Sequence, residues 1–512
     1  MTEFKPLPLL AGAITFSEAV DDETDVLRKL SYPEKRLDFY QFLHTHASDI
    51  ETIVSHHLGV SRDTCRVPWV DEWVHGSFNV CIPVYVHGRK SIAIRFPLPY
   101  KIGESTHQGN AEEKLRCEVA TYAWMQAHCP SVPIPRLWGF CFPGKPSFTT
   151  LDRAPLLSRL CWYIHRSICW IFGKPTASSY VVHPHRQKLS SGYMVMDYVA
   201  NGRMLSAAWH VVDNDINKRR ALYQGISRIM LGMAQVPFRQ IGSLTIDDCG
   251  VVSLANRPLG LHLHQLENEE ISTGIPRNLT YASTDTYLLD RLACHDNRLR
   301  YQPNSITDQA DGASQMSTLT IMRALMPHFT LKERRHGPFV LMLTDLHSSN
   351  IFVDDDGHVT CVIDLEWACA LPGEMLQPPY WLTNRAIDEI TDDNLAEYAE
   401  RHKEFISVFR VEEEACGSTT SYAEMMSKNW ELGGSWYFTA IDSLNGLYNL
   451  FLQHIQPRYG PEAVQGWKEF ERSVTPYWTP GTTKFINQKI QEREHYLQRL
   501  REVFQRASST EP

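Results

Sequence analysis

The sequence predicts an α+β protein of two lobes: a first lobe with an antiparallel sheet and one long helix, and a largely helical second lobe. Three observations lead to this prediction. Short apolar runs separated by turn residues fill the chain up to residue 199, as in a sheet of short strands. One segment among them, 111–128, has the apolar spacing of a helix. After a polar linker at 200–202, helical patterns dominate.

The first lobe should contain several strands and two helical regions. Residues 35–58 have helical spacing, and 111–128 forms a second helix that ends at three prolines. A pair of strands is expected over 69–86, around a tight turn at His75-Gly76-Ser77. Further short strands are expected at 91–96, 137–142 and 193–199.

In the second lobe, helices are expected at 218–235, 435–455 and 484–507. The last of these has an apolar stripe that should pack on the body of the protein or on a second copy. Residues 296–318 are rich in Asn, Asp, Gln and Ser, which predicts a surface loop or a disordered insertion.

These patterns suggest four regions. They are an N-terminal helical extension (1–60), a first lobe (61–199), a second lobe (200–480) and a C-terminal amphipathic helix (481–512). An insertion at 143–190 interrupts the strand pattern. Its apolar stretch 156–172 contains Arg159 and Arg166, so it is too short and too charged to span a bilayer. We expect it to pack on the protein, with a membrane-surface helix as the alternative.

Composition restricts the class of protein further. The net charge of −9 and the pI of about 6.2 provide no basic footprint for nucleic acid. The 12 cysteines include no C-x-x-C pair and favour buried free thiols in a reducing compartment. The N-terminus lacks the pattern of a targeting signal and no segment has the pattern of a transmembrane helix, so we expect a cytoplasmic protein. The oligomeric state stays open.

The most informative motif begins at Asp345. An Asp, four residues and then Asn350 is the spacing of a kinase catalytic loop, where the Asp accepts the hydroxyl proton and the Asn holds magnesium. An apolar strand precedes Asp345. A hairpin with an Asp-Gly turn follows Asn350 and should bring Asn350 close to Asp364. Both offer hard oxygen ligands for Mg²⁺. The alternative is an ordinary hairpin in which Asn350 and Asp364 cap turns.

At these residues the chain resembles a known family. DLHSSNIFVD and VIDLEWA resemble the catalytic and metal-binding motifs of the aminoglycoside phosphotransferase family, which includes choline-kinase-like enzymes, and are similar to a group of fungal members of unknown substrate. The resemblance covers roughly residues 60–460. It implies a bilobal protein-kinase-like fold that uses ATP and Mg²⁺. It also implies that Asp345 is the catalytic base and that Asn350 and Asp364 are metal ligands.

The resemblance also assigns roles in the first lobe. Gly76 and Ser77 would cover the phosphates, with a plain hairpin turn as the alternative. Glu118 would pair with the basic residue of the preceding strand, unless it faces solvent. The hinge, which would bind adenine through its backbone, would consist of Met196, Asp197, Tyr198 and Val199. The alternative is that this segment is an ordinary buried strand.

Two positions depart from the family pattern. Arg95 stands where a kinase has lysine, so it either binds phosphate with altered geometry or only pairs with Glu118. Leu343-Thr344 replaces the usual His-Gly before Asp345. We therefore expect a phosphotransferase that moves the γ-phosphate of ATP to a hydroxyl of a small molecule. The alternative is a pseudokinase that binds nucleotide or serves as a scaffold. A protein kinase is disfavoured because no Ala-Pro-Glu follows Asp364.

Three further features near the motif have two interpretations each. His347 either contacts a phosphate or packs and caps the loop. Glu366 either assists the metal or caps a helix. An acidic group either attracts a cationic acceptor or forms a solvated face; it consists of Asp388, Glu389, Asp392 and Asp393.

Overall fold

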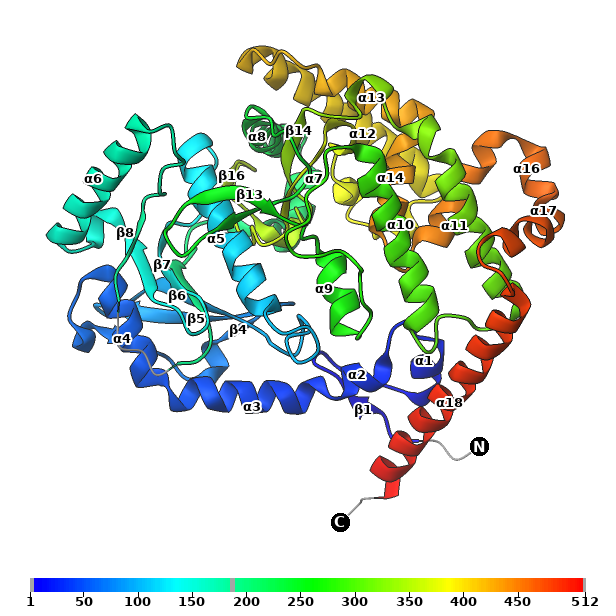
Figure 1. The fold of residues 1–512 in the computed structure, drawn as a ribbon, viewed down its shortest axis with the longest axis horizontal. Coiled ribbons are helices and arrows are strands. Elements are labelled where there is room, and N and C mark those ends of the chain that lie inside the picture. The colour runs from blue at the N-terminus through cyan, green and yellow to red at the C-terminus, as the bar shows by residue number, and fades with distance from the viewer. Residues whose placement is uncertain (1–3, 185–188, 510–512) are drawn as a thin grey trace.

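The computed structural model describes residues 4–184 and 189–509 (Figure 1). Within these ranges, eight strands form one antiparallel sheet in the order β3-β5-β6-β10-β7-β8-β9, with β4 also paired to β5. The strands are β3 (Cys65–Arg66), β4 (Val74–His75), β5 (Asn79–Val86), β6 (Arg89–Pro97), β7 (Leu137–Cys141), β8 (Ser147–Thr150), β9 (Tyr180–Val182) and β10 (Tyr193–Asp197). The expected sheet is confirmed. The insertion at 143–190 supplies β8 and β9 and so extends the sheet, where we had expected an interruption.

Alternation along β6 decides what each face of the sheet contacts. Ile92, Ile94 and Phe96 belong to the core under α3 (Tyr32–Thr45) and α4 (Ala47–Leu58). Ala93 belongs to the core under α5 (Asn110–His128), on the other face. Arg95 shares the face of Ala93 and therefore points toward α5. The single helix expected at 35–58 is wrong: the chain leaves helical geometry at His46, which separates α3 from α4.

The second lobe is mainly helical, as predicted. A hairpin of β12 (Ser243–Ile246) and β13 (Val252–Asn256) packs against α5 and joins this lobe to the first. The helices that follow β11 (Arg203–Met204) are α7 (Leu205–Asp213), α8 (Ile216–Ala234), α9 (Leu261–Asn268), α10 (Thr284–Tyr301), α11 (Gln309–Phe329), α12 (Asp392–Cys416), α13 (Tyr422–Leu432), α14 (Gly434–Asp442), α15 (Leu447–Leu450), α16 (Pro461–Gln465) and α17 (Trp467–Val474).

Two expectations in this lobe are wrong. Residues 296–318 are not a loop, because most of them belong to α10 and α11. The Asp308 side chain caps α11 by accepting hydrogen bonds from two backbone amides, and Met316 lies fully buried. The polar residues of this stretch cap the helices or lie on their exposed faces. Residues 435–455 form α14, α15 and a π-helical turn, because the chain is extended at Ser443.

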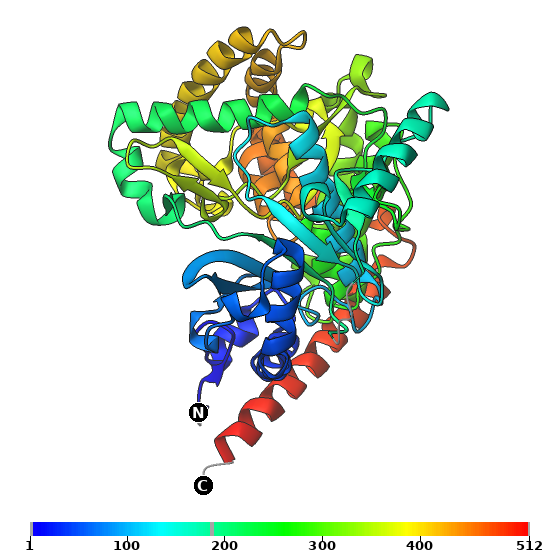
Figure 2. The same cartoon turned by 90° about the vertical axis from the view of Figure 1, so that its left-hand side faces the viewer.

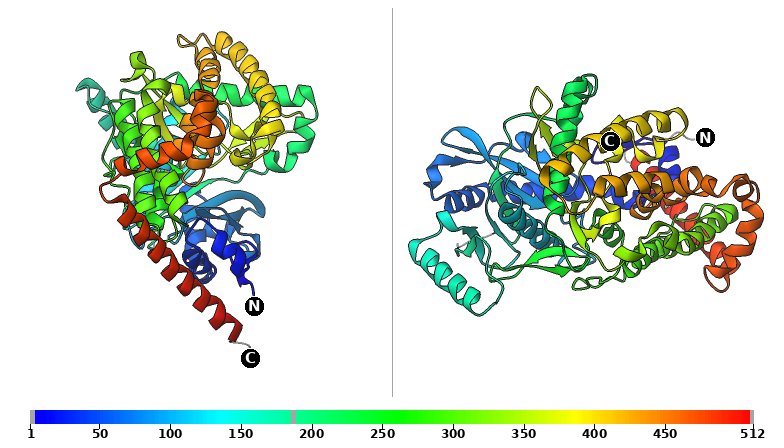
Figure 3. Two further views of the ribbon diagram at one scale, coloured as in Figure 1. Left: turned by 90° about the vertical axis from the view of Figure 1, so that its right-hand side faces the viewer. Right: turned by 90° about the horizontal axis from the view of Figure 1, so that it is seen from above.

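The two ends of the chain pack together. α18 (Thr482–Ser509) confirms the helix expected at 484–507. Its stripe contacts an N-terminal segment made of β1 (Leu7–Pro8), β2 (Ala13–Ile14), α1 (Phe16–Asp21) and α2 (Val26–Leu30). Figure 3 shows this long helix along the outside of the protein, close to the N-terminus. The stripe therefore packs on the body of the protein.

The helix of the insertion behaves differently from our expectation. α6 (Leu156–Ile171) was expected to pack its apolar residues on the protein, but most of them are exposed. Of its 16 residues, only Cys169 is buried. A search of the described ranges finds no helix both long and apolar enough to cross a membrane.

Candidate active site

Two antiparallel ladders bring the motif residues together. β14 (Phe339–Leu343) pairs with β17 (Ala368–Pro372), and β15 (Ile351–Val353) pairs with β16 (Val359–Val362). The loop from β14 to β15 holds Asp345, and the loop from β16 to β17 holds Asp364. Because the same two ladders close both loops, the loops run side by side. The Ile363 amide donates a hydrogen bond to the Asn350 carbonyl at 2.9 Å, which confirms the predicted proximity of Asn350 and Asp364.

The Asp345 loop is held by internal hydrogen bonds. The Asn350 side-chain amide donates to the Asp345 carbonyl at 3.0 Å, and the Trp381 indole donates to the Leu346 carbonyl at 2.7 Å. The His347 ring nitrogen accepts a hydrogen bond from the Ser349 amide. His347 therefore caps the turn, which is one of its two predicted roles. Burial, together with the charges of Glu366 and Asp364, raises the pKa of Asp345 to about 7. That pKa suits a group that must accept a proton near neutral pH.

The departure at Leu343-Thr344 has a structural explanation. The Thr344 hydroxyl donates to the Trp367 carbonyl at 2.6 Å, and the Thr344 backbone amide donates to the same carbonyl at 3.2 Å. Leu343 packs partly buried against the core next to α5. Threonine thus connects the Asp345 loop directly to the segment after Asp364.

Asp364 lies at a strained position in the backbone. Its φ of 61° is in the left-handed region, which residues other than glycine adopt rarely and at a cost of about 1–3 kcal/mol. This conformation aims the carboxylate at Arg95, with which it forms an ion pair. Such strain persists only where surrounding contacts fix it, and it is common at functional sites.

Arg95 lies at the centre of a buried group of charges. Its guanidinium contacts Glu118 at 2.6 Å and Glu366 at 3.3 Å, in addition to Asp364. The predicted pairing with Glu118 is confirmed, and Glu118 is only 1% exposed, so the solvent-facing alternative is wrong. Although burial opposes its charge, the three carboxylates hold the pKa of Arg95 well above its ordinary value.

Lys114 and Asn79 complete this group; Asn79 belongs to the glycine turn that was expected to cover the phosphates, whereas the sequence did not single out Lys114. The Lys114 ammonium is fully buried and lies 2.6 Å from the Glu366 carboxylate and 2.7 Å from the Asn79 amide oxygen. The Asn79 amide nitrogen donates to Glu366 at 2.6 Å. Glu366 therefore caps no helix. The one available signal was spacing, since Lys114 precedes Glu118 by one helical turn on α5.

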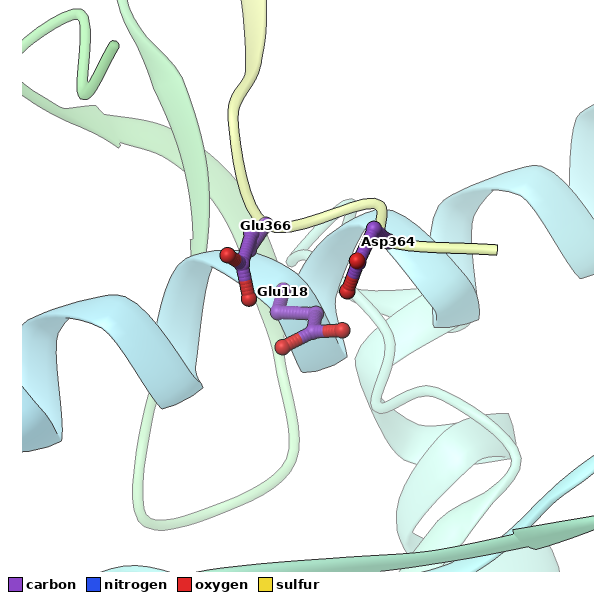
Figure 4. Close-up of side chains that lie close together, drawn as sticks. All are labelled: Glu118, Asp364 and Glu366. Atoms are coloured by element: carbon purple, nitrogen blue, oxygen red, sulfur yellow. The ribbon is translucent and has the colours of Figure 1, made fainter. Parts of the chain in front are cut away.

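Three carboxylates of this group form a possible cation site. Oxygens of Glu118, Asp364 and Glu366 lie within 4.8 Å of one another, and Figure 4 shows the three side chains converging from α5 and from the loop after β16. Asn350 lies on the neighbouring loop, and its amide oxygen is the atom left for a ligand because its side-chain nitrogen donates to the Asp345 carbonyl. Carboxylate and amide oxygens are the ligands that Mg²⁺ prefers, so the residues present fit this ion.

The glycine turn lies above the loop that holds Asp364. The Gly76 amide donates to the Asn79 carbonyl at 2.9 Å and closes the turn, while Ser77 at its tip is exposed. The Phe78 ring contacts Trp367 edge-on, with ring centroids 5.4 Å apart. The turn therefore covers the charged group from the side of the first lobe.

The hinge segment lies further along the same sheet. Asp197 pairs with Ile92 in the β10–β6 ladder, and the Tyr198 amide donates to the Ser91 carbonyl at 2.9 Å. Met196 packs in the core beneath α5, and Val199 follows in the linker. Ile92, the partner of Asp197, lies three residues from Arg95 along an extended strand. The hinge therefore lies roughly 10 Å from Arg95.

A cavity of about 400 Å³ opens on the other side of the Asp345 loop. Asp345 and His347 lie at its wall. Aromatic and aliphatic side chains form most of the remainder, and they include Tyr380, Trp381, Tyr398, Trp430 and Trp436. A cavity of this size accommodates a drug-sized molecule.

The acidic group near this cavity does not line it. Asp388, Glu389, Asp392 and Asp393 are exposed, and from this stretch only Ile387 contributes to the cavity wall. This supports the solvated-face interpretation. The one carboxylate in the wall besides Asp345 is Asp442, which is paired with Arg291 at 3.1 Å.

Comparison with known proteins agrees with the family resemblance. Residues 259–409, which include Asp345, Asn350 and Asp364, match the sequence model of the phosphotransferase enzyme family. Over these residues the match agrees with the predicted resemblance. No curated relative matches the chain.

Three solved phosphotransferase structures are similar to this chain at low sequence identity. The ADP-bound aminoglycoside phosphotransferase APH(2'')-Ib shares 11% identity over 79% of this chain and 93% of its own, with a TM-score of 0.36. A ternary complex of APH(2'')-IIa with streptomycin and ATP shares 10% identity over 84% and 97%, with a TM-score of 0.37. A type I macrolide 2'-phosphotransferase shares 11% identity over 83% and 95%, with a TM-score of 0.32.

Proposed function

We propose that this protein transfers the γ-phosphate of ATP to a hydroxyl group of a small molecule. One observation carries the proposal: Asp345, Asn350 and Asp364 lie on two adjacent loops, of which one contributes Asp364 to the buried charged group and the other places Asp345 at the wall of the aromatic cavity. Asp345 accepts the proton of the attacking hydroxyl. Asn350 and Asp364 would hold Mg²⁺, and the ion would supply positive charge to neutralise the phosphates. Catalysis then depends chiefly on positioning and on charge stabilisation.

The first lobe would hold the nucleotide. The backbone of Met196, Asp197, Tyr198 and Val199 would bind the adenine ring, and the turn at Gly76 and Ser77 would cover the phosphates. Arg95 would exchange its carboxylate partners for phosphate oxygens, while Glu118 keeps the guanidinium in place. We place the activity in the cytoplasm, because the cysteines that the structure describes form no disulfide and a reducing compartment keeps thiols reduced.

The cavity restricts the chemistry of the acceptor. Its wall is mainly aromatic and aliphatic, its only unpaired acid is Asp345, and the exposed acidic group lies outside it. A polycationic acceptor would lack counter-charges there and would lose hydration. We therefore propose an acceptor with a flat, apolar body and a hydroxyl that reaches Asp345.

The decisive experiment combines ATP binding with ATP consumption. Wild-type protein, ATP and Mg²⁺ are incubated with a panel of hydroxylated compounds that includes aromatic alcohols and polycationic amino sugars. Asp345→Asn should lower turnover by about 10³-fold or more while nucleotide affinity stays within roughly threefold, because the base is lost but the nucleotide contacts remain.

Asp356→Asn is the matched control. Asp356 is exposed at the tip of the β15–β16 hairpin, so this variant should keep wild-type turnover. Full activity of Asp345→Asn would refute the role of Asp345. If the wild-type protein binds ATP but consumes none with any compound, the nucleotide-binding pseudokinase is supported.

A further inference from the structure

α6 presents an apolar face to the outside of the protein. Nine large apolar side chains between 156 and 172 are 48–81% exposed. They are Leu156, Leu157, Leu160, Tyr163, Ile164, Ile168, Trp170, Ile171 and Phe172. At 100° per residue they gather on one side of the helix. A continuous apolar surface of this kind marks an interaction site on a soluble protein.

The opposite side of α6 attaches the helix to the protein. The less exposed positions of the helix are Ser158, Arg159, Trp162 and Cys169, which recur at helical spacing. The Trp162 indole donates to the Ser178 carbonyl at 2.8 Å, and Cys169 is 7% exposed. α6 stands out from the edge of the sheet, between β8 and β9, and Figures 1 and 2 show it projecting from the body. Its apolar side therefore faces away from the protein.

The charges around α6 are of one sign. Residues 153–174 contain two arginines in the helix, Arg159 and Arg166, and a basic residue at each end, Arg153 and Lys174, but no acidic residue. The chain as a whole has a net charge of −9, so this segment is an exception. The nearest acid along the chain, Asp152, is paired with Arg136 at 2.6 Å and also lies 3.8 Å from Arg153. The basic residues of this segment that have no ion pair in the described part of the chain are therefore Arg159, Arg166 and Lys174. A partner for this surface should carry negative charge and accept apolar side chains.

We propose that α6 binds to the surface of an anionic lipid bilayer, with its axis parallel to the membrane. An apolar face flanked by basic residues, with aromatic rings such as Trp170 and Phe172, is the pattern of an interfacial helix. A second copy of the chain is disfavoured, because docking two α6 helices would bring together two sets of like charges. The helix projects from the body of the protein, which suits insertion between lipid headgroups. This inference does not depend on the proposed function.

Vesicle cosedimentation of the full chain tests the proposal. Vesicles of phosphatidylcholine alone are compared with vesicles that contain about a third phosphatidylserine at low salt. We expect the protein to bind the anionic vesicles roughly tenfold more strongly or better, because each basic residue near the surface adds attraction. A triple variant, Leu160→Gln/Ile164→Gln/Ile171→Gln, should lower partitioning by about tenfold or more. Glutamine keeps helix propensity, so α6 should remain folded.

A second triple variant serves as the matched control. Ile216→Gln/Leu432→Gln/Tyr477→Gln removes exposed apolar side chains elsewhere and should bind vesicles like the wild type. Failure of the wild type to bind either vesicle overturns the proposal, as does equal loss of binding in both triple variants. Self-association that only the α6 variant abolishes, without vesicle binding, would assign the surface to a second copy and also overturn it. The assay measures no turnover, so it is independent of catalysis.

Discussion

Lys114 is a fully buried ammonium whose partners are buried as well. It contacts Glu366 and Asn79 within 2.7 Å and lies 4.0 Å from Glu118. A buried ion pair contributes little net stability against an apolar replacement of the whole pair, but the removal of one partner leaves a charge without compensation. The group therefore constrains which substitutions the site tolerates.

Lys114→Met should lower the free energy of unfolding by roughly 3–5 kcal/mol, because Glu366 loses its closest cation. The double variant Lys114→Met/Glu366→Gln should cost less than the sum of the two single variants by about 1 kcal/mol or more. Urea denaturation of the four proteins gives these values. Lys428→Met, at an exposed position on α13, should leave stability within about 0.5 kcal/mol. Strict additivity in the double variant would show that the two groups do not interact.

Glu374 is a buried acid away from the active-site loops. Burial raises its pKa to about 7, and the hydrogen bond from the Leu331 amide only partly opposes this effect. Its second oxygen has no hydrogen-bond partner in the described part of the chain. In the unfolded chain a glutamate titrates near pH 4.3. Between these values the folded protein binds a proton that the unfolded chain has lost, so stability falls as pH rises from about 4 through 7.

Glu374→Gln should remove this loss. Glutamine keeps the acceptor for Leu331 and carries no charge, so the free energy of unfolding should rise by up to roughly 3 kcal/mol at pH 8. At pH 5 the variant should exceed the wild type by only about 1 kcal/mol, since the folded wild type is still protonated there and only the unfolded chain has lost most of its proton. Denaturation at both pH values tests this, with exposed Glu424→Gln as the control. An equal effect of Glu374→Gln at the two pH values would contradict the raised pKa.

At the scale of elements, helices and strands were predicted correctly where the apolar periodicity and the turn residues at the ends of the segment indicated the same boundaries. The hairpin of β15 and β16, the helix α5 and the strand β14 all follow from apolar spacing with clear boundaries. The stretch 296–318 failed because composition was weighed above capping, and Asp308 marks the start of α11. The apolar face of α6 is visible in the sequence. Its outward direction depends on contacts at the sheet edge that no local pattern encodes.

The contacts between the two active-site loops were also beyond the sequence. Threonine in front of Asp345 was seen only as a departure from a motif. Its hydroxyl contacts the carbonyl of Trp367, on the loop of Asp364, because the β14–β17 ladder aligns Leu343 with Ala368. Likewise Lys114 was missed, because its position one helical turn before Glu118 does not by itself distinguish it from the other polar residues of α5.

Thr344→Val should reduce kcat by roughly tenfold while the KM for ATP changes little, because a small displacement of Asp345 affects proton transfer more than nucleotide binding. Thr344→Ser retains the hydroxyl and should restore most of the rate. Steady-state kinetics with an acceptor from the panel measures both constants. If the valine variant keeps the wild-type kcat, the bond between the two loops does not position the base.

At the scale of the whole molecule, the first and last segments of the chain hold each other in place. The Tyr496 hydroxyl of α18 accepts a hydrogen bond from the Val26 amide at 2.8 Å, and Leu500 and Phe504 are fully buried beside the N-terminal segment. α18 also packs on α11 of the second lobe. The N-terminal segment continues into α3 and α4, which cover the sheet of the first lobe. The extension therefore connects the C-terminal helix to both lobes, and α18 should determine whether the first 30 residues stay in place.

Leu500→Ala tests this connection. Truncating a fully buried leucine should lower the free energy of unfolding by about 2–4 kcal/mol through lost contacts and a residual cavity. Because the cavity lies between α18 and the N-terminal segment, limited proteolysis should remove that segment before it cuts either lobe. Mass spectrometry of the early fragments measures the order of cleavage. Arg499→Ala changes the exposed neighbour on the same helix and should match the wild type in both stability and fragments. If Leu500→Ala destabilises the protein but leaves the cleavage order unchanged, the N-terminal segment is held by its other contacts and α18 serves only the second lobe.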